Sequence, residues 1–194
     1  MGFLERLEEL ARKLYDMNSS HDFDHVLRVV EWAKVMGERE GADMEVLLAA
    51  AYLHDVAREM ERKDPNLDHA LEGAKIAEKV LKELRMDEEK IRRVKRAIEE
   101  HRYKRGMRPS SKESAILQDA DRLDALGGIG IYRLFMHSFE TGRSVEDTLR
   151  HIEEKLLRLP DLMNTQTAKK IARDRVKVVE KLYESLKEDL KGRG

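Results

Sequence analysis

Apolar side chains recur at spacings of three and four residues along most of this sequence, which places them on one face of an α-helix. The sustained alternation of apolar and polar residues that would predict β-strands is absent from it. The prolines, at positions 65, 109 and 160, fall in breaks of the helical pattern. The sequence therefore predicts an all-α fold, a bundle of about eight to nine helices. The expected helices span residues 3–17, 22–39, 43–58, 66–85, 88–103, 111–126, 128–141, 145–158 and 164–190.

Composition is typical of a globular protein and excludes several kinds of site. The length of 194 residues predicts a single domain over 1–194, and 41% hydrophobic against 40% charged residues excludes a disordered chain. A net charge of −1 gives no general attraction to nucleic acid or acidic membranes, so we expect neither as a partner. Because there is no cysteine, disulfides, thiolate ligands and cysteine nucleophiles are excluded. The N-terminal segment lacks a secretory apolar region, which predicts a cytoplasmic location.

His54 and Asp55 follow a mostly apolar run from Met44 to Leu53. Such a run predicts a helix that is buried nearly all round. A histidine and a carboxylate at its end are costly to bury unless something satisfies them. A metal ion would satisfy both, so this dyad is the starting point for a metal-site hypothesis.

Other polar residues also fall on helix faces that are otherwise apolar. His25 and His101 lie on the apolar faces of their predicted helices, and His69 and Asp121 occupy similar positions on two more. A single inward histidine is more often a hydrogen-bonded core residue than a ligand. Burying several ionisable groups without compensation, however, would cost several kcal/mol. A divalent cation would remove that cost by accepting the imidazole nitrogens and neutralising the carboxylates.

These residues carry a family resemblance. His25, His54-Asp55 and Asp121, in that order on separate helices, resemble the H…HD…D signature of the HD-domain metal-dependent phosphohydrolases. The similar flanking segments are Ser20–Val29, Leu53–Arg58 and Asp119–Gly127. The stretches Glu154–Thr165 and Ile171–Arg175 resemble the C-terminal part of small stand-alone HD hydrolases of bacteria and archaea. The resemblance implies a single HD domain, with a metal-binding core at about 20–127 and a C-terminal helical part at about 128–190.

The resemblance also implies that His25, His54, Asp55 and Asp121 are the metal ligands. Two imidazoles and two carboxylates form a mixed nitrogen and oxygen set, which suits one divalent ion of manganese, magnesium, cobalt, nickel or iron. We expect the ion to polarise phosphorus and to activate the attacking water.

Other residues near these ligands could support them. Asp119 and Asp124 compete with Asp121, which is preferred because the metal aspartate of the family precedes a basic and then a hydrophobic residue. Otherwise they would cap, orient or contact substrate, or be ordinary salt-bridged carboxylates. His21 and Asp22 are expected to cap the helix of His25 or to support the ligands.

Arginines in these segments are candidates for binding phosphate. Arg58 stands three residues after Asp55, where some relatives carry a carboxylate, and it cannot act as a base near neutral pH. Its guanidinium suits a bidentate clamp on a phosphoryl group. Arg28 and Arg122 are further candidates, and surface ion pairing is the alternative for all of them. The segment 102–105 could form a basic, stacking rim or a solvated loop.

His69 and His101 have two interpretations. In relatives with two metal ions, two further histidines between the HD dyad and the last aspartate hold the second ion. In the small hydrolases that this chain resembles most, such histidines would instead contact substrate or act as a general acid, since imidazole titrates near neutral pH. We favour one metal ion, with a second as the alternative.

The resemblance implies hydrolysis of a soluble nucleotide, a nucleoside mono- or triphosphate, by attack of a metal-bound water on phosphorus. The alternatives are a two-metal hydrolase of a dinucleotide or cyclic signalling nucleotide, a di-iron oxygenase of the same superfamily, and a non-catalytic nucleotide sensor. The intact ligand set argues against the sensor. A homodimer is the default expectation for a soluble enzyme of this size.

Overall fold

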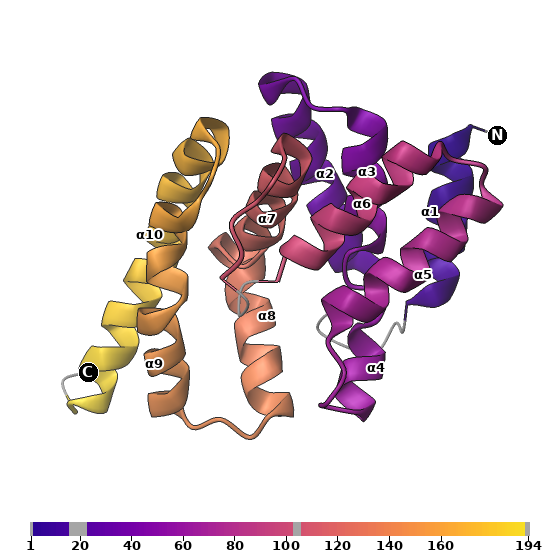
Figure 1. The fold of residues 1–194 in the computed structure, drawn as a ribbon. Coiled ribbons are helices and arrows are strands. Elements are labelled where there is room, and N and C mark those ends of the chain that lie inside the picture. Colours follow the sequence, from indigo (N-terminus) through magenta and orange to yellow (C-terminus); the bar gives the residue numbers. More distant parts are fainter. Residues whose placement is uncertain (1, 16–22, 103–105, 193–194) are drawn as a thin grey trace. The chain divides into compact units, whose positions relative to one another are not determined.

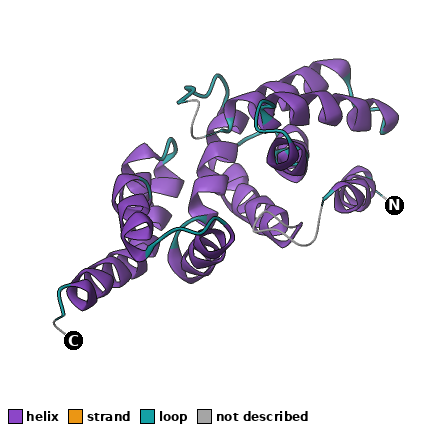
Figure 2. Ribbon diagram, turned by 90° about the horizontal axis from the view of Figure 1, so that it is seen from below, coloured by secondary structure: helices purple, strands orange, loops and turns teal. Residues whose placement is uncertain are grey.

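The computed structural model describes residues 2–15, 23–102 and 106–192. Every regular element in these ranges is a helix, as Figure 2 shows, so the predicted all-α class is confirmed. The chain forms two compact units, Met1–Ala120 and Asp121–Gly194, and the boundary falls inside helix α7 (Lys112–Asp124). The expected single HD domain over 1–194 stays a prediction.

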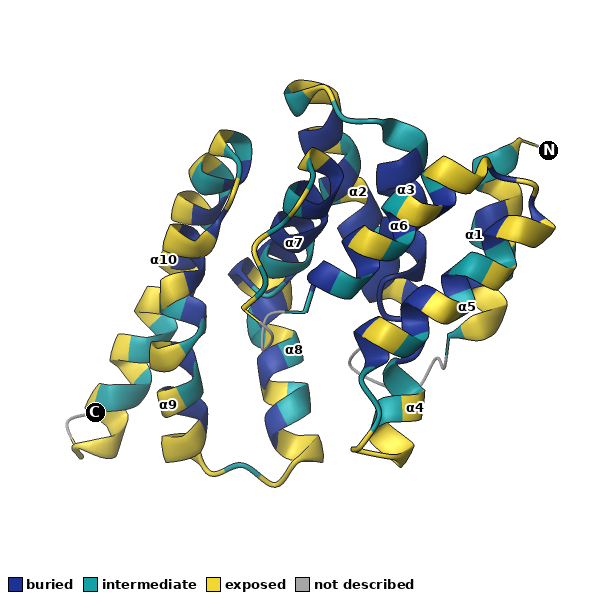
Figure 3. Cartoon of the chain, viewed as in Figure 1, coloured by how far each residue is buried: buried dark blue, intermediate teal, exposed yellow. Residues whose placement is uncertain are grey.

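Helix α3 (Met44–Leu53) is the central element of the first unit. Helices α1, α2, α5 and α6 all pack against it, and Figure 1 shows α2, α3 and α6 side by side. Every residue from Val46 to Leu53 is buried (Figure 3), as expected for an apolar run without a polar face. The other helices of this unit before α7 are α1 (Phe3–Leu14), α2 (Phe23–Glu40), α4 (Arg58–Lys63), α5 (His69–Glu83) and α6 (Glu88–Glu100).

A glycine allows α2 and α3 to approach closely. A Cβ atom at Gly37 would lie 2.6 Å from Cδ2 of Leu47 and 2.7 Å from Sδ of Met44, so a larger residue would force these side chains to move. Only a short connection joins them, and they therefore run antiparallel. This pairing brings the start of α2, with His25, beside the end of α3, with His54.

The second unit continues with α8 (Gly127–Glu140), α9 (Val145–Glu154), the 3₁₀ helix η2 (Leu156–Leu162) and α10 (Gln166–Leu190). Helix α10 packs against α8, α9 and η2. Thr165 caps it by accepting a hydrogen bond of 3.1 Å from the Ala168 amide. None of the described helices has the length and apolarity needed to cross a bilayer.

Several expected helices end earlier than predicted, and the differences are largest for two of them. The helix expected at 43–58 stops at Leu53, and α4 begins at Arg58 after a turn. The helix expected at 145–158 stops at Glu154, and η2 then runs through Pro160. In the first case the hydrogen bonding changes at the break, because the Val56 amide donates to the carbonyl of Leu53 at 3.3 Å.

Candidate metal centre

The HD dyad lies in a turn at the end of α3. His54 is the C-cap residue of that helix, and Asp55 belongs to the following turn, residues 54–57. The Asp55 amide donates to the Tyr15 hydroxyl at 3.3 Å, and that hydroxyl donates to the Tyr52 carbonyl at 3.1 Å. The Arg58 amide closes the turn on the Asp55 carbonyl at 2.9 Å. Hydrogen bonds to the amide and to the carbonyl of Asp55 therefore fix its backbone, and with it the direction of its side chain.

Four histidines surround the Asp55 carboxylate. The Nε2 atoms of His25 and His54 each lie 3.9 Å from its Oδ2 atom. The Nε2 atoms of His69 and His101 each lie 3.4 Å from its Oδ1 atom. All of these side chains are at most 3% exposed. Residues from α2, from α5 and from the ends of α3 and α6 thus converge on one buried carboxylate, each half of which faces a pair of imidazoles.

Hydrogen bonds on the outer nitrogens fix the tautomers of three of these rings. Nδ1 of His54 lies 2.8 Å from the Ala51 carbonyl, and Nδ1 of His101 lies 2.6 Å from the Ile98 carbonyl. Because a carbonyl can only accept, both Nδ1 atoms carry the proton. The Nε2 atoms then direct their lone pairs inward, which is the arrangement of metal-ligating histidines.

Nδ1 of His69 has two close neighbours, and chemistry decides between them. It lies 2.9 Å from Oε2 of Glu61 and 3.0 Å from Nη1 of Arg58. Arginine can only donate and a carboxylate can only accept, so one contact must dominate. We assign the proton to Nδ1 and the hydrogen bond to Glu61, because the same Arg58 nitrogen already donates to Glu61 at 3.2 Å. His69 therefore also directs its Nε2 lone pair inward.

His69 is neutral near pH 7. Burial lowers the pKa of His69 to about 4, with the nearby Asp55 carboxylate opposing the shift and Arg58 adding to it. A neutral imidazole is the form that binds a metal, whereas a general acid must hold its proton near neutral pH. This pKa favours a ligand or substrate-contact role for His69 over the general-acid role considered from the sequence.

The donor set fits a divalent cation. Two ligand atoms that share an octahedral ion at about 2.1 Å lie about 3 Å apart when adjacent and about 4.2 Å apart when opposite. The separations of 3.4 and 3.9 Å between the Nε2 atoms and Asp55 fall in this range, and they exceed an ordinary hydrogen bond. Ligand atoms of Asp55, His69 and His101 all lie within 4.8 Å of one another, so the first unit alone contains a potential metal-binding group.

Arginines and carboxylates line the same site. Nε of Arg58 lies 3.4 Å from Oδ2 of Asp55, and the Arg58 side chain is one-third exposed. Arg102 donates to Glu61 at 2.7 Å and to Asp68 at 2.9 Å. Of the segment 102–105 predicted as a rim or loop, only Arg102 lies within the described residues. Glu61 thus joins two arginines to His69.

The remaining predicted residues have varied positions. Arg28 lies half-buried on α2, and Asp119 is buried on α7. In the second unit, Nη1 of Arg122 donates to the Leu162 carbonyl at 2.6 Å, and Asp124 pairs with Arg133 at 2.6 Å. The predicted supporting role of Asp124 stays a prediction. His21 and Asp22 lie outside the described residues.

Asp121, half-buried on α7, is the first residue of the second unit, and its ligand role stays a prediction.

Sequence reasoning missed Tyr15 and Glu61. Tyr15 carries no signal, because it lies 40 positions before Asp55 and contacts it only through the fold. Glu61 follows Arg58 by three residues, a helical spacing that could have suggested their contact.

Comparison with known proteins agrees with this geometry. The model of the HD domain family matches residues 22–126. The chain belongs to the HD domain family. The uncharacterized protein YpgQ of Bacillus subtilis strain 168 is 34% identical over 187 residues, which cover 92% of this chain and 89% of YpgQ. A crystal structure of YpgQ in complex with ADP superposes with a TM-score of 0.79 at 29% identity, covering 98% of this chain and 100% of that one.

Two further HD proteins have solved structures of the same fold. A predicted HD superfamily hydrolase from an uncultured Thermotogales bacterium is 31% identical, with a TM-score of 0.73 over 96% of this chain and 92% of that one. An HD-superfamily hydrolase from Bacillus thuringiensis is 34% identical, with a TM-score of 0.75 over 97% and 96%. The predicted class, a metal-dependent hydrolase with an HD domain, is confirmed at this level.

Proposed function

We propose that this HD domain is a phosphohydrolase that acts on a soluble nucleotide, a nucleoside mono- or triphosphate, with one divalent metal ion. The observation that carries the proposal is the convergence of four buried imidazoles on the Asp55 carboxylate. That arrangement is expensive to bury unless a cation shares it. The complex of YpgQ with ADP supports a nucleotide as the ligand class.

The ion would be held by His25, His54 and Asp55, which lie together in the first unit, and Asp121 on helix α7 is the fourth ligand that the family resemblance implies. Their mixed nitrogen and oxygen atoms suit manganese, magnesium, cobalt, nickel or iron. When bound, such an ion supplies Lewis acidity and lowers the pKa of water. The residues of the chain orient the ligands: the Ala51 carbonyl fixes the His54 ring, and Tyr15 fixes the turn of Asp55.

Arg58 and Arg102 would bind the phosphoryl oxygens. Both are held by Glu61, which fixes their position before substrate arrives. Arg58 also lies beside Asp55, so a phosphoryl group next to the carboxylate would lie within its reach. A guanidinium in this position would stabilise charge that develops on phosphorus oxygens in the transition state.

A second candidate function has its own observation. Oδ1 of Asp55 lies 3.4 Å from the Nε2 atoms of both His69 and His101, and these residues form a potential metal-binding group. Asp55, His69 and His101 would then hold a second ion, and two ions would suit a hydrolase of a dinucleotide or cyclic nucleotide.

A screen of metals against substrates tests both candidates. Purified protein is loaded separately with Mn²⁺, Mg²⁺, Co²⁺ or Ni²⁺, and phosphate and pyrophosphate release is measured from mono-, di-, tri- and cyclic nucleotides. Arg58→Ala should lower turnover by about 100-fold, and Arg62→Ala on the same short helix should not. Failure of every nucleotide to react would refute the proposal. Metal analysis giving two ions per chain, with cleavage confined to dinucleotides or cyclic nucleotides, would favour the second candidate.

A further inference from the structure

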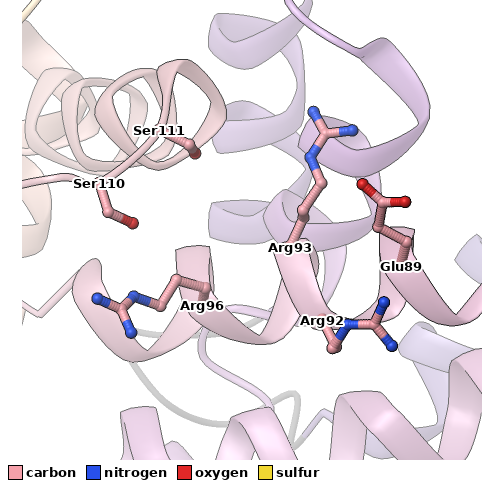
Figure 4. Close-up of a pocket in the computed structure, with 6 residues that line it drawn as sticks. All are labelled: Glu89, Arg92, Arg93, Arg96, Ser110 and Ser111. Carbon is pink, nitrogen blue, oxygen red and sulfur yellow. The ribbon is translucent and has the colours of Figure 1, made fainter.

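The first unit has a concave site outside the histidine cluster. A cavity of about 430 Å³ lies between α6 and the beginning of α7 (Figure 4). Its lining residues are Glu89, Arg92, Arg93, Arg96, Ser110 and Ser111. The volume is in the range of small-molecule pockets. None of these residues belongs to the group that surrounds Asp55, so the cavity needs its own explanation.

The Arg96 side chain is held through its Nε atom, so its two terminal NH₂ groups can contact a ligand. Its Nε atom donates to Glu100 at 2.6 Å. Glu100 is buried and also accepts from the Ser110 amide at 2.9 Å and the Ser114 hydroxyl at 2.6 Å. Despite the opposing effect of burial, these hydrogen bonds from Ser114 and Ser110 lower the pKa of Glu100, which therefore stays charged. The Arg96 guanidinium is thus oriented through one nitrogen, while its two terminal NH₂ groups extend on the Ser110 side (Figure 4).

The other lining residues differ in what they can offer. Arg92 stands one turn before Arg96, is exposed, and forms no ion pair with a described residue. Arg93 pairs with Asp43 at 2.9 Å and with Glu113 at 3.2 Å, so its charge is already compensated. The Ser111 hydroxyl accepts from the Ser114 amide at 3.1 Å, which leaves its own proton available for donation.

We propose that this cavity binds a small phosphomonoester whose remainder carries hydroxyl groups. Arg92 and Arg96 are four residues apart on one helix, and Figure 4 shows their guanidinium groups extending toward opposite ends of the cavity. Both side chains are exposed, so they can turn to donate N–H groups to the same phosphate. Glu89 lies beside Arg92 (Figure 4) and would repel a long polyanion, but its carboxylate can accept hydrogen bonds from hydroxyl groups. The pocket therefore suits one phosphoryl group and a neutral, hydroxylated body better than a polyphosphate.

Calorimetric titration of the full chain tests this proposal in EDTA, which removes any metal-dependent binding. Ribose 5-phosphate is the probe for the phosphomonoester, and inorganic phosphate is the probe for a free anion. We expect saturable binding of ribose 5-phosphate with one site per chain. Arg92→Glu, at an exposed position that should leave the fold intact, should weaken it by about tenfold or more. Glu89→Gln should weaken ribose 5-phosphate but not inorganic phosphate.

Two control variants separate this site from the rest of the molecule. Arg6→Glu makes the same charge change at an exposed position on α1 and should bind the probe as the unaltered chain does. His54→Ala disables the proposed metal centre and should also leave probe binding unchanged, so the two proposals fail independently. Binding that survives Arg92→Glu, binding lost in His54→Ala, or no saturation by about 10 mM ribose 5-phosphate would each overturn the proposal.

Discussion

The carboxylate of Asp55 lies close to the imidazoles of four histidines, so the negative charge of this one group affects all of the proposed ligands around it. Asp55→Asn preserves the size of the side chain and removes the charge. We expect it to lower metal affinity and nucleotide hydrolysis by more than about 100-fold, because changing only the partners of ligands already costs 10- to 100-fold. Metal analysis after dialysis and a turnover assay measure the two effects.

The matched control for this variant is Asp189→Asn, at an exposed position near the end of α10. It should keep metal content and turnover at the level of the unaltered chain. If Asp55→Asn also kept both, the carboxylate would not be a ligand.

Tyr15 is far from Asp55 in the sequence but forms a hydrogen bond with the same turn. Its hydroxyl joins the Tyr52 carbonyl to the Asp55 amide, and Tyr15→Phe removes both hydrogen bonds while keeping the ring. We expect about a tenfold loss of metal affinity, the lower end of the range for residues that orient ligands. Competition with a fluorescent chelator measures it. Tyr132→Phe, at an exposed position on α8, should have no effect. An unchanged affinity in Tyr15→Phe would mean that the turn is fixed without this phenol.

Residue patterns predicted that the histidines point inward, but they did not predict which residues hydrogen-bond to this site and hold it in place. His25 and His101 could be assigned inward positions because each shares a helical face with apolar residues, and the structure buries both. Tyr15 and Glu61 reach the site through the packing of α1 on α3 and of α4 on α5. Such contacts depend on tertiary structure, which the periodicity of a single helix does not contain.

Among the helices, the break between α3 and α4 shows where the pattern of apolar residues predicts too long a helix. The sequence continues with helix-compatible residues through Arg58, and a helix over 43–58 was the natural prediction. The structure instead turns after Leu53, because the Asp55 amide bonds to the Tyr15 hydroxyl and leaves the helical hydrogen-bond pattern. This turn directs the Asp55 carboxylate at the four imidazoles.

Helix α9 carries a prediction about pH. Burial lowers the pKa of His151 from its ordinary 6.5 to about 4, and the positive charges of Lys155 and Arg143 add to the shift. Below about pH 6.5 the unfolded chain takes up a proton at this residue before the folded chain does. The contribution of His151 to stability is therefore complete above pH 6.5 and is lost as the pH falls toward 4.

Thermal unfolding of His151→Gln in EDTA tests this expectation. Its melting temperature should fall less than that of the unaltered chain between pH 6.5 and pH 4. Measurements at two pH values above 7 provide the internal control, because there the difference between the two proteins should stay constant. Parallel curves across the whole range would show that His151 titrates in the folded state as it does in the unfolded state.

At the scale of the whole molecule, the sequence predicted the all-α class because helical spacing extends through both units. The family resemblance implied a change from the metal-binding core to the C-terminal part at about residue 127, whereas the compact units divide after Ala120, inside α7. Compactness depends on contacts between helices, and no proline, glycine run or polar linker interrupts the sequence at that point. Asp55 and the four histidines that converge on it all come from the first unit.

Metal binding should therefore appear as global stabilisation, since several helices contribute ligands that the unfolded chain cannot bring together. At a free Mn²⁺ concentration about 100 times the dissociation constant, we expect about 2.7 kcal/mol of stabilisation. For a chain of this length that corresponds to a rise in melting temperature of roughly 5 to 11 °C. Differential scanning calorimetry with and without EDTA measures it. Asp55→Asn should show no rise, whereas Asp189→Asn should show the full rise. An equal rise in both variants would place the stabilising ion outside the histidine cluster.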